Sequence, residues 1–390
     1  MRENAELTHS GKKKVLLVIR WPVGGIRTFV RYVYRNFDPS KWHFTIIAPE
    51  HEQMKILVDD LSKFEVVHIP VFGIPNDGSS GFWKMFRCVT YQILRNEYVL
   101  VHSHGFTSGM CAAIPSFLRH TPHLMTSHET LNDKQFAGMR GKTRKLGMEV
   151  LFRLIDKVHS VSYDAQDNFL GYFSRLARKR DKFLVIPNGI EVDRFLKAES
   201  RNLRNELELD NDVFLIGFLG RFMAPKGFFY LVEAIDILLQ RNDLPRRPLV
   251  LMFGEGGWFR AEMRSIQKKG LEDYFLSMPF TPNVASTIKA LDVVTMPSLW
   301  EACGLLAMET LICGTPLIGS NCIGLREVLR GTPAKTVPKA DADALAQALL
   351  QEMKMNRKEI FMSFRKTAAE KFDVTNTSQH ILNLYQTLVR

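Results

Sequence analysis

The sequence has no cysteine pair whose spacing suggests a metal knuckle or a redox dithiol. Its five cysteines are an odd number without a C-x-x-C pair, which argues against a disulfide framework and fits a reducing compartment. A Walker A loop, a zinc-ligand spacing and a nucleophile-elbow serine are also missing. No apolar run reaches the roughly 20 residues of a membrane-spanning helix, and residues 1–10 are too polar for a secretory signal. We therefore expect a cytoplasmic protein, soluble or peripheral to the inner face of the membrane, with no metal.

Positive charge is in excess, and it is unevenly distributed. Residues 1–195 contain 28 lysines and arginines against 19 acidic residues, whereas residues 196–390 contain 24 against 22. A basic first half can attract an anionic membrane, a phosphorylated lipid or nucleic acid, although solvated helix faces explain the same charge. Because aromatic residues do not interleave with the basic ones, nucleic acid is the least expected of these partners.

Short β-rich apolar runs alternate with longer helical patterns twice along the chain, which indicates two parallel sheets built from βαβ units. The turn-forming stretch 186–190 ends the first series, so we predict one Rossmann-like domain over 1–190 and a second over 191–374. A last apolar helix near 375–390 can dock on either half. The expected strands are 14–19, 43–49, 65–69, 98–102, 123–127, 157–162, 183–186, 213–219, 248–253, 274–278, 293–297 and 315–319.

Two strand ends carry residues suited to phosphate. Gly24 and Gly25 follow the first strand and precede a helix, where backbone N–H groups could approach a diphosphate, although a tight turn explains them equally well. Gly220 and Arg221 follow strand 213–219, and Lys226 comes five residues after Arg221. An arginine fork and a lysine charge could together hold one diphosphate, unless they are merely solvated loop cations.

The stretch 297–309 is the strongest motif, because two glutamates accompany an apolar helix start. If the helix began at Glu301, its carboxylate would lie about 12 Å along the axis from that of Glu309, too far for a retaining glycosidase pair. Two such carboxylates instead suit the hydroxyls of an elongated ligand, with helix N–H groups near residues 303–306 for phosphate. The alternatives are dipole compensation by Glu301 and an internal salt bridge for Glu309.

Histidines and a D-x-D spacing complete the candidates. His102, His104 and His128 lie near the carboxyl ends of predicted strands, and His128 is favoured over His104 as a functional residue. Asp341 and Asp343 have the spacing that some sugar-nucleotide enzymes use for a divalent metal. Because an amphipathic segment follows them directly, one of the two is expected to be a helix N-cap, and we reject a metal site.

In this order the motifs resemble glycosyltransferase family 4, retaining enzymes of the GT-B fold. That α/β fold has two Rossmann-like, doubly wound domains that face each other across a cleft. The resemblance covers most of the chain, and its specific part is the R-x4-K pair of Arg221 and Lys226 with the E-x7-E pair of Glu301 and Glu309. Cys303 departs from the family by replacing an aromatic residue, which leaves the sugar preference open.

The resemblance implies a role for each matching residue. Arg221 and Lys226 would hold the donor diphosphate and stabilise the leaving group, while His128 and Glu301 would contact the transferred sugar. Glu309 would bind the ribose, and the final helix 375–390 would cross back to the first domain. The other donor-binding positions would be Gly24, Gly25, Gly220, Gly254, Phe280, Cys303, Gly304, Leu305 and Leu306.

The resemblance implies a retaining transferase that moves a hexose-type sugar from a UDP- or GDP-sugar to a glycan or lipid-linked acceptor. Cell-surface polysaccharide or lipopolysaccharide synthesis would be the setting, and neither a metal nor another cofactor is expected. Two alternatives remain on the same scaffold. One is a nucleotide-sugar epimerase, and the other is a non-catalytic subunit that binds sugar nucleotides.

Overall fold

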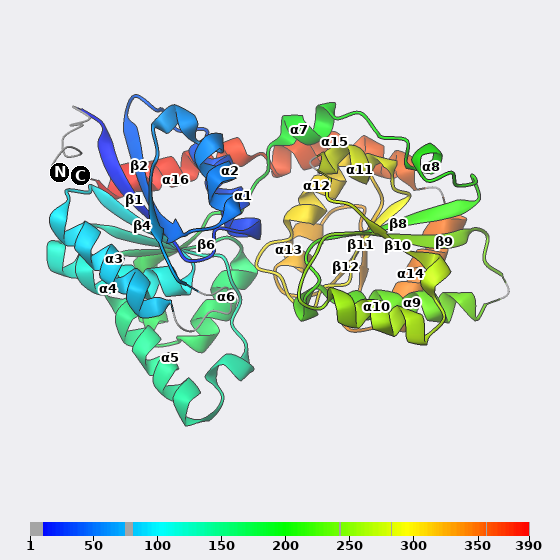
Figure 1. The fold of residues 1–390 in the computed structure, drawn as a ribbon, viewed down its shortest axis with the longest axis horizontal. Helices are drawn as coiled ribbons and strands as arrows, with labels where there is room; N and C mark the ends of the chain where they lie inside the picture. The colour runs from blue at the N-terminus through cyan, green and yellow to red at the C-terminus, as the bar shows by residue number, and fades with distance from the viewer. Residues whose placement is uncertain (1–10, 75–80, 242, 282, 356, 390) are drawn as a thin grey trace. The chain divides into compact units, whose positions relative to one another are not determined.

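A computed structural model describes residues 11–74, 81–241, 243–281, 283–355 and 357–389 (Figure 1). The chain divides into two compact units. Unit 1 is Met1–Pro187 with Thr375–Arg390, and unit 2 is Asn188–Val374. The sequence places this boundary three residues later, at 190. The polar N-terminal residues 1–10 lie outside the described part.

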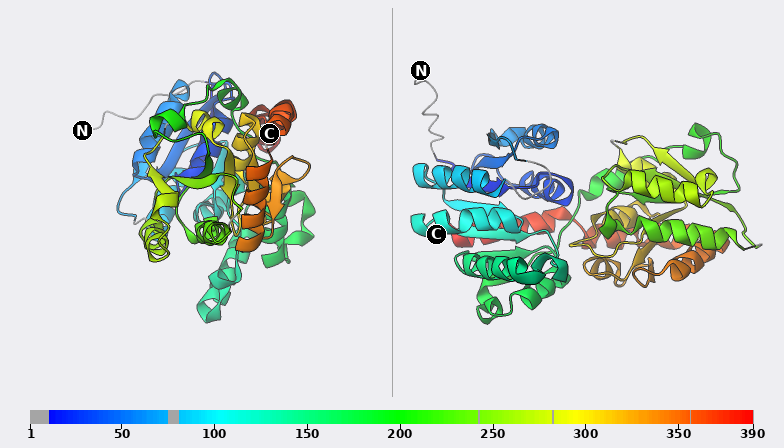
Figure 2. Two further views of the ribbon diagram at one scale, coloured as in Figure 1. Left: turned by 90° about the vertical axis from the view of Figure 1, so that its right-hand side faces the viewer. Right: turned by 60° about the horizontal axis from the view of Figure 1, so that its bottom comes forward.

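The described part of unit 1 contains a seven-stranded sheet in the order β3-β2-β1-β4-β5-β6-β7, and all its strand pairs are parallel. The strands are β1 (Lys13–Ile19), β2 (Trp42–Pro49), β3 (Val67–Val71), β4 (Leu100–His104), β5 (His123–Ser127), β6 (Lys157–Ser160) and β7 (Phe183–Val185). Helices connect them and flank the sheet (Figures 1 and 2): α1 (Gly24–Tyr34), α2 (Glu52–Asp60), α3 (Phe82–Arg95), α4 (Phe106–Arg119), α5 (Gly138–Arg153), α6 (Tyr163–Tyr172) and α16 (Val374–Leu388).

Unit 2 has six parallel strands in the order β10-β9-β8-β11-β12-β13 among its described residues. They are β8 (Val213–Leu219), β9 (Arg247–Phe253), β10 (Phe275–Met278), β11 (Val293–Met296), β12 (Leu317–Ser320) and β13 (Lys335–Val337). The helices are α7 (Val192–Lys197), α8 (Leu203–Glu206), α9 (Phe228–Leu239), α10 (Phe259–Lys268), α11 (Val284–Ala290), α12 (Leu305–Cys313), α13 (Leu325–Leu329), α14 (Ala342–Lys354) and α15 (Lys358–Lys371).

Each strand order reverses at one point, which fixes where a ligand can enter. In unit 1 the chain runs outward from β1 on one side and from β4 on the other, and in unit 2 the reversal lies between β8 and β11. The connections leave these neighbouring strands for opposite faces of the sheet, and in open α/β sheets ligands bind at the carboxyl ends of the strands at such a point. Arg221 and Lys226 follow β8, and Glu301 follows β11. Three of the predicted site residues therefore lie at the reversal point of unit 2.

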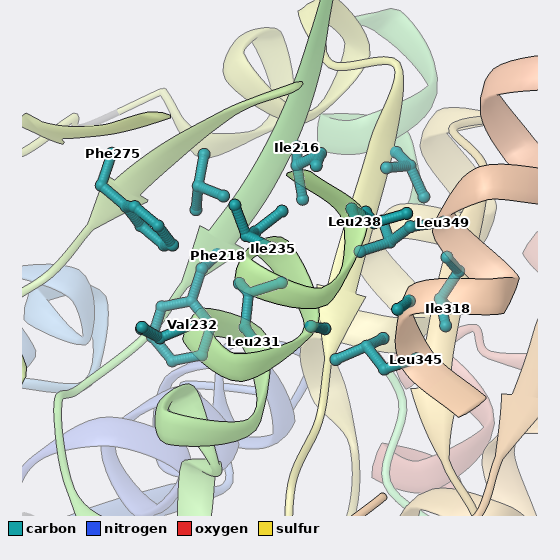
Figure 3. Packing of buried hydrophobic residues seen from close by; sticks show 14 of the residues in the cluster. Ile216, Phe218, Leu231, Val232, Ile235, Leu238, Phe275, Ile318, Leu345 and Leu349 are labelled. Carbon is teal, nitrogen blue, oxygen red and sulfur yellow. The ribbon is translucent and has the colours of Figure 1, made fainter. Parts of the chain in front are cut away.

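The core of unit 2 explains why these loops have a rigid base. Helix α9 is mostly apolar, and it packs against the sheet and against α14, which itself contacts β12 and β13 (Figure 3). Removing each such large apolar side chain from water stabilises the fold by about 1.5–3 kcal/mol. The buried side chains at this centre include Ile216, Phe218, Leu231, Val232, Ile235, Leu238, Ile318, Leu345 and Leu349.

Most predicted elements agree with the structure, and the differences have simple causes. Strands β5 and β8 coincide with the predicted ranges, whereas β4 continues two residues beyond residue 102, through His104. Strand β13 is missed because Lys335–Val337 offers no apolar run. Helix α12 begins at Leu305 and not at Glu301, the start that the distance argument assumed, because Gly304 is its N-cap. The axial distance of about 12 Å from Glu301 to Glu309 therefore does not apply.

Candidate active site

The loop after β8 is held by glycines whose backbone approaches its neighbours closely. Gly227 has a φ of +65°, and a Cβ there would lie 2.0 Å from the carbonyl oxygen of Pro297. Gly254, after β9, has a φ of +137°, and a Cβ there would lie 2.1 Å from the carbonyl oxygen of Gly220. Side chains at Gly227 and Gly254 are therefore excluded on both conformational and steric grounds. The loops after β8, β9 and β11 consequently pack against one another.

Lys226 and Glu301 form an ion pair between the loops after β8 and β11. The Lys226 Nζ lies 2.7 Å from the Glu301 Oε1, and Ser298 Oγ donates to the same oxygen over 2.8 Å. The Glu301 side chain is only 11% exposed, and the Lys226 side chain is 28% exposed. A backbone hydrogen bond from Leu299 N to Pro225 O, at 2.8 Å, joins the same two loops. The second residue of the R-x4-K motif, Lys226, thus contacts the first residue of the E-x7-E motif, Glu301.

Arg221 is exposed and has no ion-pair or hydrogen-bond partner among the described residues. It extends from a loop that is fixed on its other side, because Phe222 N donates to Glu255 O over 3.0 Å and Trp258 N donates to Phe222 O over 3.2 Å. The guanidinium therefore remains available to an external anion, while its backbone is anchored. The structure does not bring Arg221 into contact with Glu301 or Glu309.

Helix α12 carries the second glutamate. Glu309 lies on the second turn, and burial raises the pKa of its carboxyl to about 7, while the positive charge of Arg194 acts in the opposite direction. A buried carboxyl at this pKa changes its hydrogen-bonding capacity near neutral pH. In the first turn of α12, Leu305 N already donates to Cys303 O over 3.0 Å, whereas the N–H of Leu306 has no preceding helical turn to accept it. The helix start therefore supplies a backbone donor a few residues after Glu301.

Four further predicted positions, Cys303, Phe280, Gly220 and Gly254, have different surroundings. Cys303 is half-buried beside Asn188, and burial together with Glu327 and Glu301 raises the pKa of its thiol to about 12, so it remains protonated. Phe280 follows β10 and is 88% exposed. Gly220 and Gly254 contribute loop packing, as described above, and nothing in their surroundings identifies a ligand contact. The structure therefore leaves the roles of these four residues as predictions.

The glycine turn of unit 1 has the expected form. Gly24 and Gly25 are exposed and open α1, after the extended residue Val23. No acidic side chain lies in the first turn of this helix. The start of α1 is thus an uncompensated positive helix end at the β1–β4 reversal point.

His128 follows β5 and lies beside a group of buried histidines. Its Nε2 is 3.1 Å from the Nδ1 of His104, and its ring packs edge-on against Phe29 with 4.9 Å between ring centroids. Burial and the neighbouring His104 and His159 hold the pKa of His128 well below its usual range. His102 and His104 are fully buried, with hydrogen bonds inside unit 1. Of the three predicted histidines, His128 alone is partly exposed.

Several residues near the site were not singled out by the sequence. Ser298 donates a hydrogen bond to Glu301, and the charge of Arg194 lowers the pKa of Glu309, yet neither residue has a spacing that indicates its partner. Burial raises the pKa of Glu129, the residue after His128. A Cβ built on Gly105 would lie 3.1 Å from the Glu129 Oε1, so this carboxyl lies over the start of α4. The His-Glu dipeptide at a strand end is the signal that could have identified Glu129.

Asp341 is the N-cap of α14, as predicted, and its Oδ1 accepts a hydrogen bond from Ala344 N over 2.8 Å. Within the part of the chain that the structure describes, no three histidine, cysteine or acidic side chains are grouped to hold a metal ion. Over the same residues, every helix is too short or too polar to cross a lipid bilayer.

Comparison with known proteins identifies the family. Residues 23–194 match the model described as Glycosyltransferase Family 4, and residues 213–354 match Glycosyl transferases group 1. A D-inositol 3-phosphate glycosyltransferase of Corynebacterium urealyticum is 29% identical over 312 residues, which are 75% of this chain and 72% of that protein. The UDP-Gal:alpha-D-GlcNAc-diphosphoundecaprenol alpha-1,3-galactosyltransferase of Escherichia coli is 26% identical over 240 residues, 60% of this chain and 61% of that protein.

Among solved structures, Anabaena Alr3699/HepE in complex with UDP-glucose superposes with a TM-score of 0.77 at 18% identity, covering 96% of this chain and 99% of that one. This likeness confirms the predicted fold class, two Rossmann-like α/β domains of the GT-B type. The two family models together match most of the chain, and they match both units. The chain therefore belongs to glycosyltransferase family 4 and is a glycosyltransferase of the GT-B fold.

Proposed function

We propose that this enzyme transfers a hexose-type sugar from a nucleotide diphosphate sugar, with retention of configuration, to a glycan or lipid-linked acceptor. The observation that carries the proposal is the Lys226–Glu301 ion pair at 2.7 Å, located where the strand order of unit 2 reverses. A cation beside a carboxylate suits a ligand in which an anionic diphosphate adjoins a sugar rich in hydroxyl groups.

The donor contacts follow from the chemistry of each side chain. Lys226 and the unpaired Arg221 bind the diphosphate, and the Leu306 N–H at the start of α12 adds a donor for the same group. Glu301 accepts hydrogen bonds from hydroxyls of the transferred sugar, and Glu309 accepts them from the ribose. Gly24 and Gly25 in unit 1 approach a phosphate or sugar, and His128 contacts a ligand hydroxyl. The complex of Alr3699/HepE with UDP-glucose supports a nucleotide-sugar donor.

We propose a front-face displacement for the transfer step. The bond between the anomeric carbon and the β-phosphate oxygen breaks, and the acceptor oxygen bonds to the same carbon from the same face. The acceptor proton passes to the departing phosphate oxygen. Arg221 and Lys226 stabilise the negative charge that grows on the diphosphate, so these two side chains perform the electrostatic work of catalysis.

We further propose that unit 1 contacts an anionic membrane through α4 and α5. Large apolar side chains are exposed on both helices, which pack against each other, and α5 projects from the sheet (Figures 1 and 2). The basic residues of α5 are Arg140, Lys142, Arg144, Lys145 and Arg153, and its apolar exposed ones are Met139, Leu146 and Val150. Its acidic residue, Glu149, is buried and paired with Arg153 at 3.5 Å.

This composition favours a lipid surface. Each lysine or arginine near an anionic membrane contributes about 1 kcal/mol, and the exposed apolar side chains can enter the headgroup layer. At the end of α5, a pocket lined by Arg153, Lys157, Arg178, Lys179 and Lys182 extends the positive charge, which Asp156 and Asp181 in the same lining offset in part. The Escherichia coli relative, whose name specifies a diphosphoundecaprenol substrate, supports a lipid-linked acceptor.

Vesicle flotation tests the membrane contact. Wild type should float with phosphatidylglycerol vesicles and stay in solution with phosphatidylcholine vesicles. The double variant Lys142→Glu with Arg144→Glu should lose flotation, whereas Arg264→Glu with Lys268→Glu, an equal charge change at exposed positions of α10, should retain it. Equal flotation of the two double variants would contradict the proposed surface.

A donor screen tests the transfer reaction. The protein is incubated with UDP-, GDP-, ADP- and CMP-sugars, with and without a chelator, and with glycan or lipid-linked acceptors. We expect nucleoside diphosphate release that the chelator does not abolish, and a product with the anomeric configuration of the donor. Epimerisation without an acceptor would indicate the epimerase, and binding without turnover would indicate a non-catalytic subunit. An inverted product would contradict the front-face displacement.

A further inference from the structure

A chain of buried polar contacts runs through unit 1 and ends at His128. It starts at the carbonyl oxygen of Ile186, 2.9 Å from His159 Nε2, and continues from His159 Nδ1 to Thr126 Oγ1 at 3.0 Å. Thr126 Oγ1 lies 2.7 Å from His102 Nε2. The hydroxyls of Tyr34 and Tyr385 each lie 2.7 Å from His102 Nδ1 and 2.9 Å from each other. His104 Nε2 lies 3.1 Å from the Tyr34 hydroxyl, and His104 Nδ1 lies 3.1 Å from His128 Nε2.

The imidazoles of this chain are neutral. Burial lowers the pKa of His104 to about 3 and that of His159 to about 4. Burial and the neighbouring histidines also hold the pKa values of His102 and His128 well below the usual range. Each ring therefore carries one N–H donor and one bare acceptor nitrogen. The position of the first proton in the chain then determines the positions of the others.

The Ile186 carbonyl fixes the first step, because a carbonyl oxygen can only accept. His159 therefore donates from Nε2, and its bare Nδ1 accepts the proton of the Thr126 hydroxyl. Thr126 has then used its only proton, so it must accept from His102 Nε2. His102 Nδ1 is consequently bare, and it faces two tyrosine hydroxyls.

The triangle of Tyr34, Tyr385 and His102 Nδ1 decides the next step. It has three short sides and, because the nitrogen is bare, only the two hydroxyl protons can fill them. If Tyr34 gave its proton to His104 instead, two of the three sides would bring lone pairs together without a hydrogen. With both protons kept in the triangle only one side lacks a hydrogen, and each further unmade hydrogen bond between buried groups costs free energy. Both protons therefore stay in the triangle, and His104 donates from Nε2 to the Tyr34 oxygen.

We propose that Tyr34 and His104 are positioning residues that hold His128 in the tautomer protonated at Nε2. With its proton on Nε2, His104 presents a bare Nδ1, which accepts the Nε2 proton of His128. The Nδ1 of His128 is then a bare nitrogen with no protein partner among the described residues. It can accept a hydrogen bond from a ligand hydroxyl but cannot donate one. That use by a ligand rests on the proposed function, whereas the tautomer itself does not.

The two tyrosines offer a matched pair of variants. Both hydroxyls are buried and touch the same His102 nitrogen, but the Tyr34 hydroxyl alone also touches His104. In Tyr34→Phe the His104 Nε2 loses its acceptor, so its proton is free to move to Nδ1 and the His128 tautomer is no longer fixed. In Tyr385→Phe the Tyr34 hydroxyl can still donate to His102 and accept from His104. The chain to His128 therefore stays intact.

Imidazole 15N spectra of protein labelled at histidine test the proposal, with His128→Gln to assign the His128 signals. Wild type and Tyr385→Phe should show a protonated Nε2 and a bare Nδ1 at His128, and Tyr34→Phe should shift both signals toward the other tautomer. If the wild-type spectrum alone showed His128 protonated at Nδ1, the proposal would be overturned, and the tyrosine variants would not be needed. Signals that are unchanged in Tyr34→Phe, or changed equally in both tyrosine variants, would also overturn it.

The transfer assay adds an independent readout. We expect kcat/KM of Tyr34→Phe to fall roughly threefold to tenfold, the effect of one hydrogen bond, and Tyr385→Phe to remain at the wild-type value. If the spectra show the expected tautomers while no donor is turned over by wild type, the proposed function fails and the tautomer assignment stands. If turnover occurs with the opposite tautomer, the assignment fails and the function stands.

Discussion

Replacing Lys226 by methionine tests the cation that the proposed function needs most. The variant keeps the length of the side chain and removes its charge from beside Glu301. An exposed ion pair contributes about 0–1 kcal/mol, and breaking a fully buried one costs about 3–5 kcal/mol. With side-chain exposures of 28% for Lys226 and 11% for Glu301, the pair lies between these limits. We expect a stability loss of about 1–2 kcal/mol.

The loss in ligand binding should be larger than the loss in stability. A hydrogen bond to a charged group contributes about 1.5–3 kcal/mol, so removing the ammonium from a diphosphate should weaken binding roughly 10-fold to 150-fold. Titration calorimetry with UDP and UDP-glucose measures this change directly. An unfolding midpoint measured in parallel separates weak binding from a damaged fold.

Lys269 provides a matched control in the same unit. Its side chain is also 28% exposed, and its Nζ also holds a carboxylate at 2.7 Å, that of Asp236, with that of Glu233 at 3.2 Å. It lies at the end of α10, away from the strand ends that carry the site. Lys269→Met should therefore lower the unfolding midpoint by a similar few degrees and leave nucleotide binding unchanged. Equal UDP affinity of the two variants would refute the assignment of Lys226 to the diphosphate.

Three further substitutions test other parts of the account. Glu301→Gln should bind UDP at least as tightly as wild type, because it removes a competing anion from Lys226, yet it should lose sugar transfer; weaker UDP binding would contradict this. Burial raises the pKa of Glu309 to about 7, so the folded state retains a proton that the unfolded chain releases above about 4.5, and stability falls as the pH rises between these values. Glu309→Gln should make the unfolding midpoint less dependent on pH in this range, and an unchanged pH dependence would contradict the raised pKa of Glu309. Gly227 and Gly270 share a φ of +65°, but of these two only Gly227 has an atom within 4 Å of a built Cβ. Gly270→Ala should therefore lower the free energy of unfolding by roughly 1–2 kcal/mol, and Gly227→Ala should lower it clearly more. Denaturant unfolding measures both losses.

The sequence predicts the sheets well because parallel strands are buried on both faces. Strand β8 is an apolar run with a turn at each end, and its predicted and observed ranges coincide. The edge strand β13 has no such apolar run, since Lys335 is only partly buried and Thr336 is exposed. Element boundaries that depend on a cap are equally hard to predict, as the late start of α12 after Gly304 shows.

Within the site, the sequence identifies residue types but not their pairings. Lys226 and Glu301 are 75 residues apart, and their contact depends on the order β8-β11, which sequence spacing does not encode. The buried chain behind His128 is less accessible still, because it combines Tyr34 and Tyr385, which are 351 positions apart. An isolated histidine or tyrosine gives no periodic signal, so such a network emerges only once the fold is known.

The proposed binding site of the donor diphosphate lies at the carboxyl ends of β8 and β11. A crystal structure of the protein soaked with UDP tests it most directly. We expect the diphosphate oxygens within hydrogen-bond distance of Lys226 Nζ and the Arg221 guanidinium, with the ribose facing Glu309. Ordered UDP bound elsewhere, with the Lys226–Glu301 pair untouched and Arg221 still free, would contradict the account.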